Sequence, residues 1–231
     1  MANSNVSAVL VHGAWADGSS WRKIIERLEA QGIRAVAAPL PLSSLQDDVA
    51  ALDRTLERID GPVVLAGHAY AGAVIGSTRA ENIEALVYVA ALAPDEGETV
   101  GDVFYRGEAH PQAPKLAPDR HGLIWLPEEA FATAFAPHAT QQELTVLSAV
   151  QRPISVSCIG EAVGRPRWKD LPGWFLIADQ DRMINPDTQH FMAQRMNARV
   201  HSYPVDHTPI VTSPDTVTQV IVEAARAIPA R

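Results

Sequence analysis

The segment 67–72 has the spacing of a catalytic turn but lacks the reactive side chain. It reads Gly-His-Ala-Tyr-Ala-Gly, follows an apolar run over residues 62–66 and precedes the helical run 73–75. A strand, a sharp turn flanked by small residues and a helix together form the nucleophile elbow, G-x-S-x-G, whose serine attacks a carbonyl carbon. Here the central residue is Ala69. Because alanine has no hydroxyl, a covalent serine ester cannot form at this position.

Two later loops contain residues that could serve as an acid and a base. Asp179 and Asp181 follow the apolar run 174–178, and His207 follows the run 199–203. Serine hydrolases with a nucleophile elbow place the acid and then the histidine after the nucleophile in the chain. Open α/β sheets bind ligands at the carboxyl ends of their strands. In such a pair, the carboxylate fixes the tautomer of the imidazole and stabilises its charged form.

Each of these residues also has a plain structural interpretation. Asp181 could cap a helix or pair with Arg182, and His207 could lie in an ordinary polar turn. Asp95, beyond the fourth apolar run, is the reserve candidate for the acid. The segment 17–21 contains two serines but is typical of a turn and helix cap, so we do not expect it to supply a substitute nucleophile.

The elements that must position these residues alternate as in a parallel sheet with crossover helices. Short apolar runs predict six strands, over residues 6–11, 33–38, 62–66, 83–91, 174–178 and 199–203. One helical face between strands is apolar, at Leu45, Val49, Leu52, Leu56 and Ile59. The predicted fold class is α/β, with a mostly parallel central sheet and helices on both faces.

Residues 94–169 break this alternation. They contain many prolines and no clear βα unit, although 128–135 and 140–150 have helical patterns. Five aromatic residues favour an ordered lid over a disordered loop, namely Phe104, Tyr105, Trp125, Phe131 and Phe135. We therefore predict a core formed by residues 1–93 and 170–231, with residues 94–169 as an inserted lid.

The loop after the first strand, Leu-Val-His-Gly-Ala-Trp over residues 10–15, resembles the oxyanion loop of the α/β-hydrolase superfamily. Together with the turn at 67–72, this loop resembles the small esterases related to plant methylesterases and hydroxynitrile lyases. The resemblance extends over nearly the whole chain. The resemblance implies an α/β-hydrolase fold. It also implies that the backbone N–H groups of Ala14 and Tyr70 bind the oxyanion.

The same resemblance assigns the remaining roles and shows two departures. A pattern similar to the family's D-x-x-I selects Asp181 over Asp179 as the acid, and His207 stands at the position of the catalytic histidine. Ala69 stands where the family has serine, and Ala71 stands where it usually has glycine.

The predicted ligand is a small-molecule ester or a similar apolar compound, because the predicted lid is rich in aromatic and aliphatic residues. We expect Trp15, His68, Phe104 and Trp125 to contact it. We expect no cofactor and no metal. A single cysteine cannot form a thiolate cage, and no histidine pair has i, i+4 spacing with an acidic partner.

Composition limits the other partners and the compartment. The chain has 231 residues and a formal net charge of −8, which disfavours nucleic acid as a partner. Cys158 is the only cysteine, which fits a reducing compartment. The first residues lack the basic and apolar pattern of a secretory signal, and no apolar stretch reaches the ~20 residues of a membrane span. We expect a cytoplasmic protein; the sequence leaves its oligomeric state open.

Three functional hypotheses follow. The first is a carboxylic-ester hydrolase of the Ser-His-Asp type, with the nucleophile replaced by Ala69 in an inactive variant or by natural loss. The second is a protein with native Ala69 that uses His207 and Asp181 as a general base, without an acyl-enzyme; Ala71 supports it, since silencing a serine enzyme requires no second change. The third is a protein that binds a small molecule.

Overall fold

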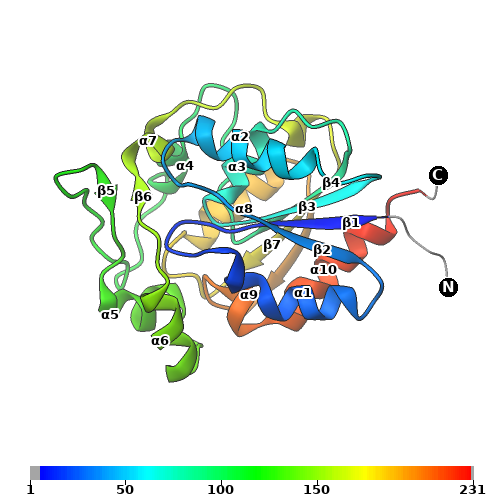
Figure 1. Cartoon of the computed structure of the whole chain (residues 1–231). Coiled ribbons are helices and arrows are strands. Elements are labelled where there is room, and N and C mark those ends of the chain that lie inside the picture. Colours follow the sequence, from blue (N-terminus) through cyan, green and yellow to red (C-terminus); the bar gives the residue numbers. More distant parts are fainter. Residues whose placement is uncertain (1–5, 230–231) are drawn as a thin grey trace.

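The computed structural model shown in Figure 1 describes residues 6–229. Six strands form one sheet in the order β2-β1-β3-β4-β7-β8, with all neighbouring strands parallel. The strands are β1 (Ser7–Val11), β2 (Arg34–Ala38), β3 (Val63–His68), β4 (Ile83–Val89), β7 (Gly173–Ala178) and β8 (Arg199–Tyr203). Each strand overlaps its predicted range, so the predicted α/β fold class is confirmed.

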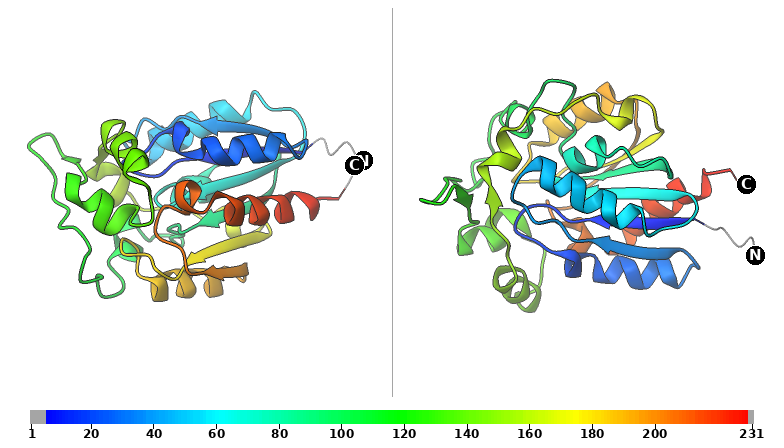
Figure 2. Two further views of the ribbon diagram at one scale, coloured as in Figure 1. Left: turned by 90° about the horizontal axis from the view of Figure 1, so that it is seen from below. Right: turned by 45° about the horizontal axis from the view of Figure 1, so that its top comes forward.

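Helices cover both faces of the sheet (Figures 1 and 2). One face carries α1 (Arg22–Glu29), α9 (Pro209–Thr212) and α10 (Pro214–Arg226), and the other carries α2 (Leu45–Leu56), α3 (Ala71–Ser77) and α8 (Pro186–Arg195). The sequence of α10 shows why a helix packs here. Its residues at i, i+3, i+4 and i+7 are all fully buried: Val217, Val220, Ile221 and Ala224. Burying one Val or Ile side chain contributes ~1.5–3 kcal/mol.

The central strands β1, β3, β4 and β7 form the core of the molecule. Every residue of β1 and β3 is buried, whereas the edge strands β2 and β8 are mostly half-buried or exposed. Strands covered on both faces lack the alternation of apolar and polar residues. This explains why the sequence of the central strands consists of nearly continuous apolar runs.

Residues 94–169, here called the insertion, connect β4 to β7. Its elements are α4 (Val100–Phe104), β5 (Leu123–Ile124), α5 (Glu128–Ala130), the π-helix η2 (Phe131–Phe135), α6 (Gln141–Ala149), β6 (Ile154–Ser155), α7 (Val156–Gly160) and the 3-10 helix η3 (Arg167–Lys169). The part that carries β5, α5, α6 and β6 lies beyond one end of the main sheet, and the last part returns over α3 (Figures 1 and 2). Strands β5 and β6 pair antiparallel in a sheet of their own. The insertion is therefore ordered, and its role as a lid stays a prediction.

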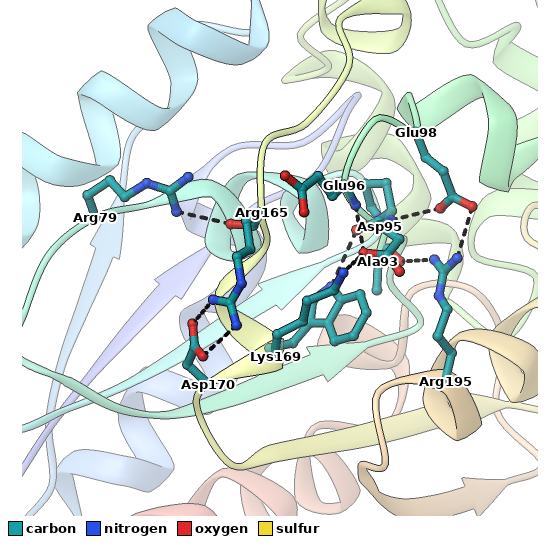
Figure 3. Close-up of polar contacts among 11 residues, drawn as sticks. Arg79, Ala93, Asp95, Glu96, Glu98, Arg165, Lys169, Asp170 and Arg195 are labelled. Atoms are coloured by element: carbon teal, nitrogen blue, oxygen red, sulfur yellow. Dashed lines mark hydrogen bonds and ion pairs between the residues drawn. The ribbon is translucent and has the colours of Figure 1, made fainter.

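The two ends of the insertion lie side by side. The N–H of Gly97 donates to the carbonyl of Val163 at 2.9 Å, and the N–H of Val163 donates to the carbonyl of Glu98 at 2.8 Å. Figure 3 shows an ion pair at the same junction, in which Lys169 Nζ lies 2.5 Å from Asp95 Oδ1. These contacts tie the two ends of the insertion to each other. Among the helices in residues 6–229, none is both long and apolar enough to cross a bilayer.

Candidate active site

Ala69 occupies the sharp turn between β3 and α3. Its φ is +51°, a left-handed conformation that costs a residue with a side chain ~1–3 kcal/mol. Three backbone hydrogen bonds hold it there: its N–H donates to Val89, and its carbonyl accepts from Gly72 at 3.1 Å and from Leu92 at 3.0 Å. The turn thus keeps a strained shape although its central residue is alanine.

Two glycines allow the backbone to pack closely around this turn. A Cβ atom on Gly72 would lie 2.3 Å from the carbonyl oxygen of Leu92. A Cβ atom on Gly13 would lie 2.9 Å from the carbonyl oxygen of His68 and 3.1 Å from the Cβ of Ala69. The loop after β1 therefore rests directly on the turn after β3, and any side chain at Gly13 would separate them.

His12 fixes the peptide between Gly13 and Ala14. Its Nε2 accepts a hydrogen bond from the N–H of Leu40 at 3.1 Å, so Nδ1 carries the proton and donates to the carbonyl of Gly13 at 2.9 Å. Burial lowers the pKa of His12, which favours this neutral tautomer. Because a trans peptide points its carbonyl and its N–H in opposite directions, the N–H of Ala14 points away from His12.

The backbone N–H groups of Ala14 and Tyr70 have no hydrogen-bond acceptor within residues 6–229. Both residues are nevertheless buried, with 7% and 3% of their surface exposed. Two unpaired backbone N–H groups beside the same turn are free to donate to an acceptor in the cavity. Both residues line the cavity described below.

His207 and Asp181 form a buried pair. Nδ1 of His207 lies 2.9 Å from Oδ2 of Asp181, and the two residues are 2% and 1% exposed. Asp181 Oδ1 accepts the N–H groups of Met183 and Ile184 at 2.7 and 2.9 Å, while Gln189 Nε2 donates to Oδ2 at 2.8 Å. These donors leave the carboxylate a single orientation, facing the imidazole. Nε2 of His207 makes no hydrogen bond to a residue in the range 6–229.

The other two candidate acids have different partners. Asp179 Oδ1 accepts a hydrogen bond from the hydroxyl of Ser202 at 2.6 Å. Asp95 forms the ion pair with Lys169 at the base of the insertion (Figure 3). Of the three carboxylates that the sequence offered, Asp181 is the one that contacts His207.

His68 lies behind His207. Its Nε2–H donates to the carbonyl oxygen of His207 at 2.7 Å, and the centres of the two rings are 5.0 Å apart. Burial, followed by the proximity of His207, lowers the pKa of His68 to about 3. His68 is therefore a neutral donor that holds the backbone of His207, and it is absent from the cavity wall.

A cavity joins these groups to the insertion. It encloses about 590 Å³ of empty space, open mouth included, and its wall is almost entirely apolar. From the core it is lined by Ala14, Trp15, Ala69, Tyr70, Leu92, Met183, Ile184 and His207. From the insertion it is lined by Val100, Phe104, Tyr105, Leu116, Ile124, Ile154 and Ile159. An apolar wall with a few polar groups is typical of a site for a small molecule.

Of the four residues predicted to contact the ligand, two line the cavity and two do not. Trp15 and Phe104 line the cavity, whereas His68 and Trp125 do not. Trp125 is 48% exposed, and its indole N–H donates to Asp119 within the insertion at 3.3 Å. The aliphatic residues that line the cavity were not identified from the sequence. The Met-Ile pair at 183–184, two residues beyond the acid, was a signal that could have found part of this lining.

A sequence profile of the alpha/beta hydrolase family matches residues 8–220. The chain belongs to this family. The parallel sheet and the strained turn at Ala69 are thus the framework of an alpha/beta hydrolase. A comparison with curated proteins gives no match. In residues 6–229 of this hydrolase, no group of three or more His, Cys, Asp or Glu side chains could hold a metal ion.

Several solved structures are similar to this alpha/beta hydrolase over nearly its whole length. A pyrethroid hydrolase from Sphingobium faniae JZ-2 is 21% identical, with a TM-score of 0.82 over 96% of this chain and 98% of the other. Polyneuridine aldehyde esterase is 18% identical, with a TM-score of 0.77 over 94% and 98%. The methylesterase MES16 from Arabidopsis is 16% identical, with a TM-score of 0.78 over 96% and 100%. At these identities the likeness shows a shared fold.

Proposed function

We propose that this alpha/beta hydrolase is built as a carboxylic-ester hydrolase and carries Ala69 in place of its serine nucleophile. The observation that carries the proposal is that two buried residues beside the turn at Ala69, Ala14 and Tyr70, have unpaired backbone N–H groups and line the same cavity. Two such donors at the edge of an apolar cavity suit an oxyanion, which they stabilise without reorganisation. We therefore assign them as the oxyanion hole.

His207 and Asp181 are the proposed base and its orienting acid. Their 2.9 Å contact uses Nδ1, which leaves Nε2 for the proton of a nucleophile. The names of the similar proteins agree with this assignment, since two are called an esterase and a methylesterase and the third a hydrolase. Trp15 and Phe104 would contact the substrate from two sides of the cavity, and the insertion would act as its lid.

The chemistry can be written for the Ala69→Ser variant. The hydroxyl oxygen at position 69 attacks the ester carbonyl carbon while its proton passes to Nε2 of His207, and the carbonyl oxygen takes its charge to the amides of Ala14 and Tyr70. Collapse of this intermediate breaks the bond to the alcohol, which leaves with the proton from His207. Water, deprotonated by His207, then attacks the acyl carbon. The bond to the oxygen at position 69 breaks, this oxygen takes the proton back from His207, and the acid is released.

The chain with Ala69 keeps every proposed part except the attacking oxygen. Loss of one member of such a triad lowers turnover by roughly 10⁴- to 10⁶-fold, while the oxyanion hole and binding still give ~10³- to 10⁴-fold over water. We therefore expect a protein that binds an ester and releases it intact.

The test is a panel of aryl and alkyl esters assayed with this chain, with Ala69→Ser, and with Ala69→Ser combined with His207→Ala. We expect hydrolysis only from the single variant, at least ~10³-fold faster than from the other two. If the folded single variant hydrolyses no ester above the rate of the parent chain, the esterase proposal is wrong.

Ala71 favours a second candidate, a protein in which Ala69 is native and His207 acts directly as a general base. Ala71 is fully buried at the start of α3, at a position where silencing a serine enzyme requires no change. In this reading the amides of Ala14 and Tyr70 stabilise an enolate or alkoxide. A serine codon at position 69 of the source gene would exclude it.

A third candidate, binding of a small molecule without chemistry, is favoured by the apolar wall of the cavity. It predicts that an apolar ligand binds with the same affinity before and after His207→Ala. If this substitution abolishes a measured turnover at unchanged affinity, binding alone is excluded.

A further inference from the structure

Trp15, the residue after Ala14, combines backbone strain with burial. Its φ is +57°, a left-handed conformation that is uncommon for any residue with a side chain and a true outlier for a bulky one. Its surface is only 7% exposed. Such a conformation persists only where the surroundings determine it, so the contacts of Trp15 show what holds the loop after β1 in shape.

Both N–H groups of Trp15 donate to the insertion. The backbone N–H donates to the carbonyl of Arg152 at 3.0 Å, and the indole Nε1–H donates to the carbonyl of Ile124 at 2.9 Å. The indole also packs edge-on against Phe135, with ring centres 6.2 Å apart and an angle of 81° between the rings. All three partners lie between residues 94 and 169, more than 100 residues further along the chain.

One acceptor belongs to the small sheet of the insertion, and the other lies two residues before it. Ile124 is in β5, which pairs with β6, and Arg152 lies just before Ile154 in β6. The side chains of Ile124 and Ile154 line the same cavity as Ala14 and Ala69. Trp15 therefore connects the wall of the cavity, through hydrogen bonds, to the loop that carries the Ala14 amide.

We propose that Trp15 is a positioning residue that couples the seating of the insertion to the assembly of the oxyanion hole. While the insertion is seated, its two carbonyls hold Trp15 in the left-handed conformation, and together with the hydrogen bond from His12 to Gly13 they hold the loop that carries the Ala14 N–H. When β5 and β6 move away, both bonds are lost and the backbone at Trp15 relaxes. Closure of the cavity and formation of the oxyanion hole are thus a single event. The part concerning the oxyanion rests on the proposed function.

The coupling is tested first by amide hydrogen exchange on the chain as it exists. The Trp15 amide should exchange together with the amides of residues 122–126 and 152–156, and more slowly in all three places than in Trp15→Phe. We expect that variant to accelerate exchange there by about tenfold, the factor that one net hydrogen bond provides. Comparison within the parent chain needs no variant, so misfolding of Trp15→Phe would not remove the test.

Trp174→Phe is the matched control. Trp174 is also buried, and its indole N–H also makes one hydrogen bond of 2.9 Å, to Glu223 of α10 on the far side of the core. The Trp174→Phe substitution removes one indole hydrogen bond that does not involve the insertion, so exchange at residues 12–16, 122–126 and 152–156 should stay as in the parent. Equal acceleration by both variants would mean a general loss of stability and would overturn the coupling.

Activity tests the oxyanion part in the Ala69→Ser background. Adding Trp15→Phe should lower kcat by about 10- to 100-fold. Removing an oxyanion donor outright costs about 100-fold or more, so a displaced donor should cost no more than that. KM should change less than about threefold. A raised KM at unchanged kcat would mean that Trp15 only shapes the cavity, and would contradict the proposal. If Ala69→Ser is itself inactive, the proposed function fails while hydrogen exchange still decides the coupling.

Discussion

Asp48 is a buried carboxylate whose orientation depends on Tyr70. It is fully buried on α2, and its Oδ2 accepts the phenol hydroxyl of Tyr70 at 2.7 Å and the weaker thiol of Cys158 at 3.6 Å. Its Oδ1 accepts the N–H of Leu42 at 2.7 Å. No Lys, Arg or His in residues 6–229 forms an ion pair with it. We predict that Tyr70→Phe destabilises the fold by an amount that depends on pH.

The magnitude follows from the lost donor. A hydrogen bond to a charged group contributes ~1.5–3 kcal/mol, and the carboxylate left behind cannot reach water. We expect Tyr70→Phe to lower the free energy of unfolding by ~2 kcal/mol at pH 7, equivalent to ~4–8 °C in Tm for a chain of this length.

The pH dependence follows from the pKa of Asp48, which burial raises and the hydrogen bond from Tyr70 lowers. A carboxyl with a raised folded-state pKa favours folding fully below its unfolded pKa of ~3.9, and this contribution is lost as the pH rises through the folded pKa. Tyr70→Phe raises the folded pKa further. The penalty of the variant should therefore be complete at neutral pH and shrink as the pH falls toward ~4.

The assay is urea unfolding of parent and variant at several pH values between 4.5 and 7.5. Asp48→Asn is the control, because an amide accepts from Leu42 and donates to the phenol oxygen without a charge. Since asparagine does not titrate, this variant should lack the pH dependence that Asp48 contributes and should gain stability relative to the parent as the pH rises from 4.5 to 7.5. A penalty for Tyr70→Phe that does not change with pH, or an equal one for Asp48→Asn at pH 7, would refute this reasoning.

Three further predictions concern the same site. Gly72→Ala should destabilise the fold by ~1–3 kcal/mol, since its Cβ would meet the carbonyl of Leu92, whereas Gly160→Ala has nothing within 4 Å and should lie within ~0.5 kcal/mol of the parent in thermal unfolding. The pKa of His68 in the folded state is about 3, so its contribution to the free energy of unfolding is present above pH ~6.5 and is lost below it at up to ~1.4 kcal/mol per pH unit. In His68→Gln the free energy of unfolding should therefore change less between pH 6.5 and 4 than in the parent. An unchanged slope would contradict the assignment. In the Ala69→Ser background, Asp181→Asn should lower kcat by ~10⁴-fold and Asp95→Asn should not, and the reverse order would make Asp95 the acid.

The elements could be predicted because their signals are local. The central strands are buried on both faces and so stand out as apolar runs, and the turn at Ala69 is marked by small residues at fixed spacing. The acid and the histidine follow strand ends, which a parallel sheet brings to one edge. Strand order brings Asp179, Asp181 and His207 to this edge, and the resemblance to the family's D-x-x-I pattern was needed to select Asp181 as the partner of His207.

The contacts of the insertion could not be predicted in this way. Trp15 reaches carbonyls at 124 and 152, and backbone carbonyls have no sequence signal at all. The path of residues 94–169 also decides which aliphatic side chains face the cavity. Trp125 and Ile124 are neighbours in sequence, yet the first is half-exposed and the second lines the cavity. Composition gave the character of the wall but not its members.

The most direct test of the site is labelling of the Ala69→Ser variant with a fluorophosphonate, read by mass spectrometry of the intact chain and of its peptides. The oxygen at position 69 should form a bond to phosphorus with loss of fluoride, adding one phosphonyl group to the peptide that contains residues 67–72. Adding His207→Ala should slow this reaction strongly, and the parent chain should stay unlabelled. A folded variant that gains no phosphonyl group at position 69 would contradict the assignment of this turn, its amides and His207 as one active site.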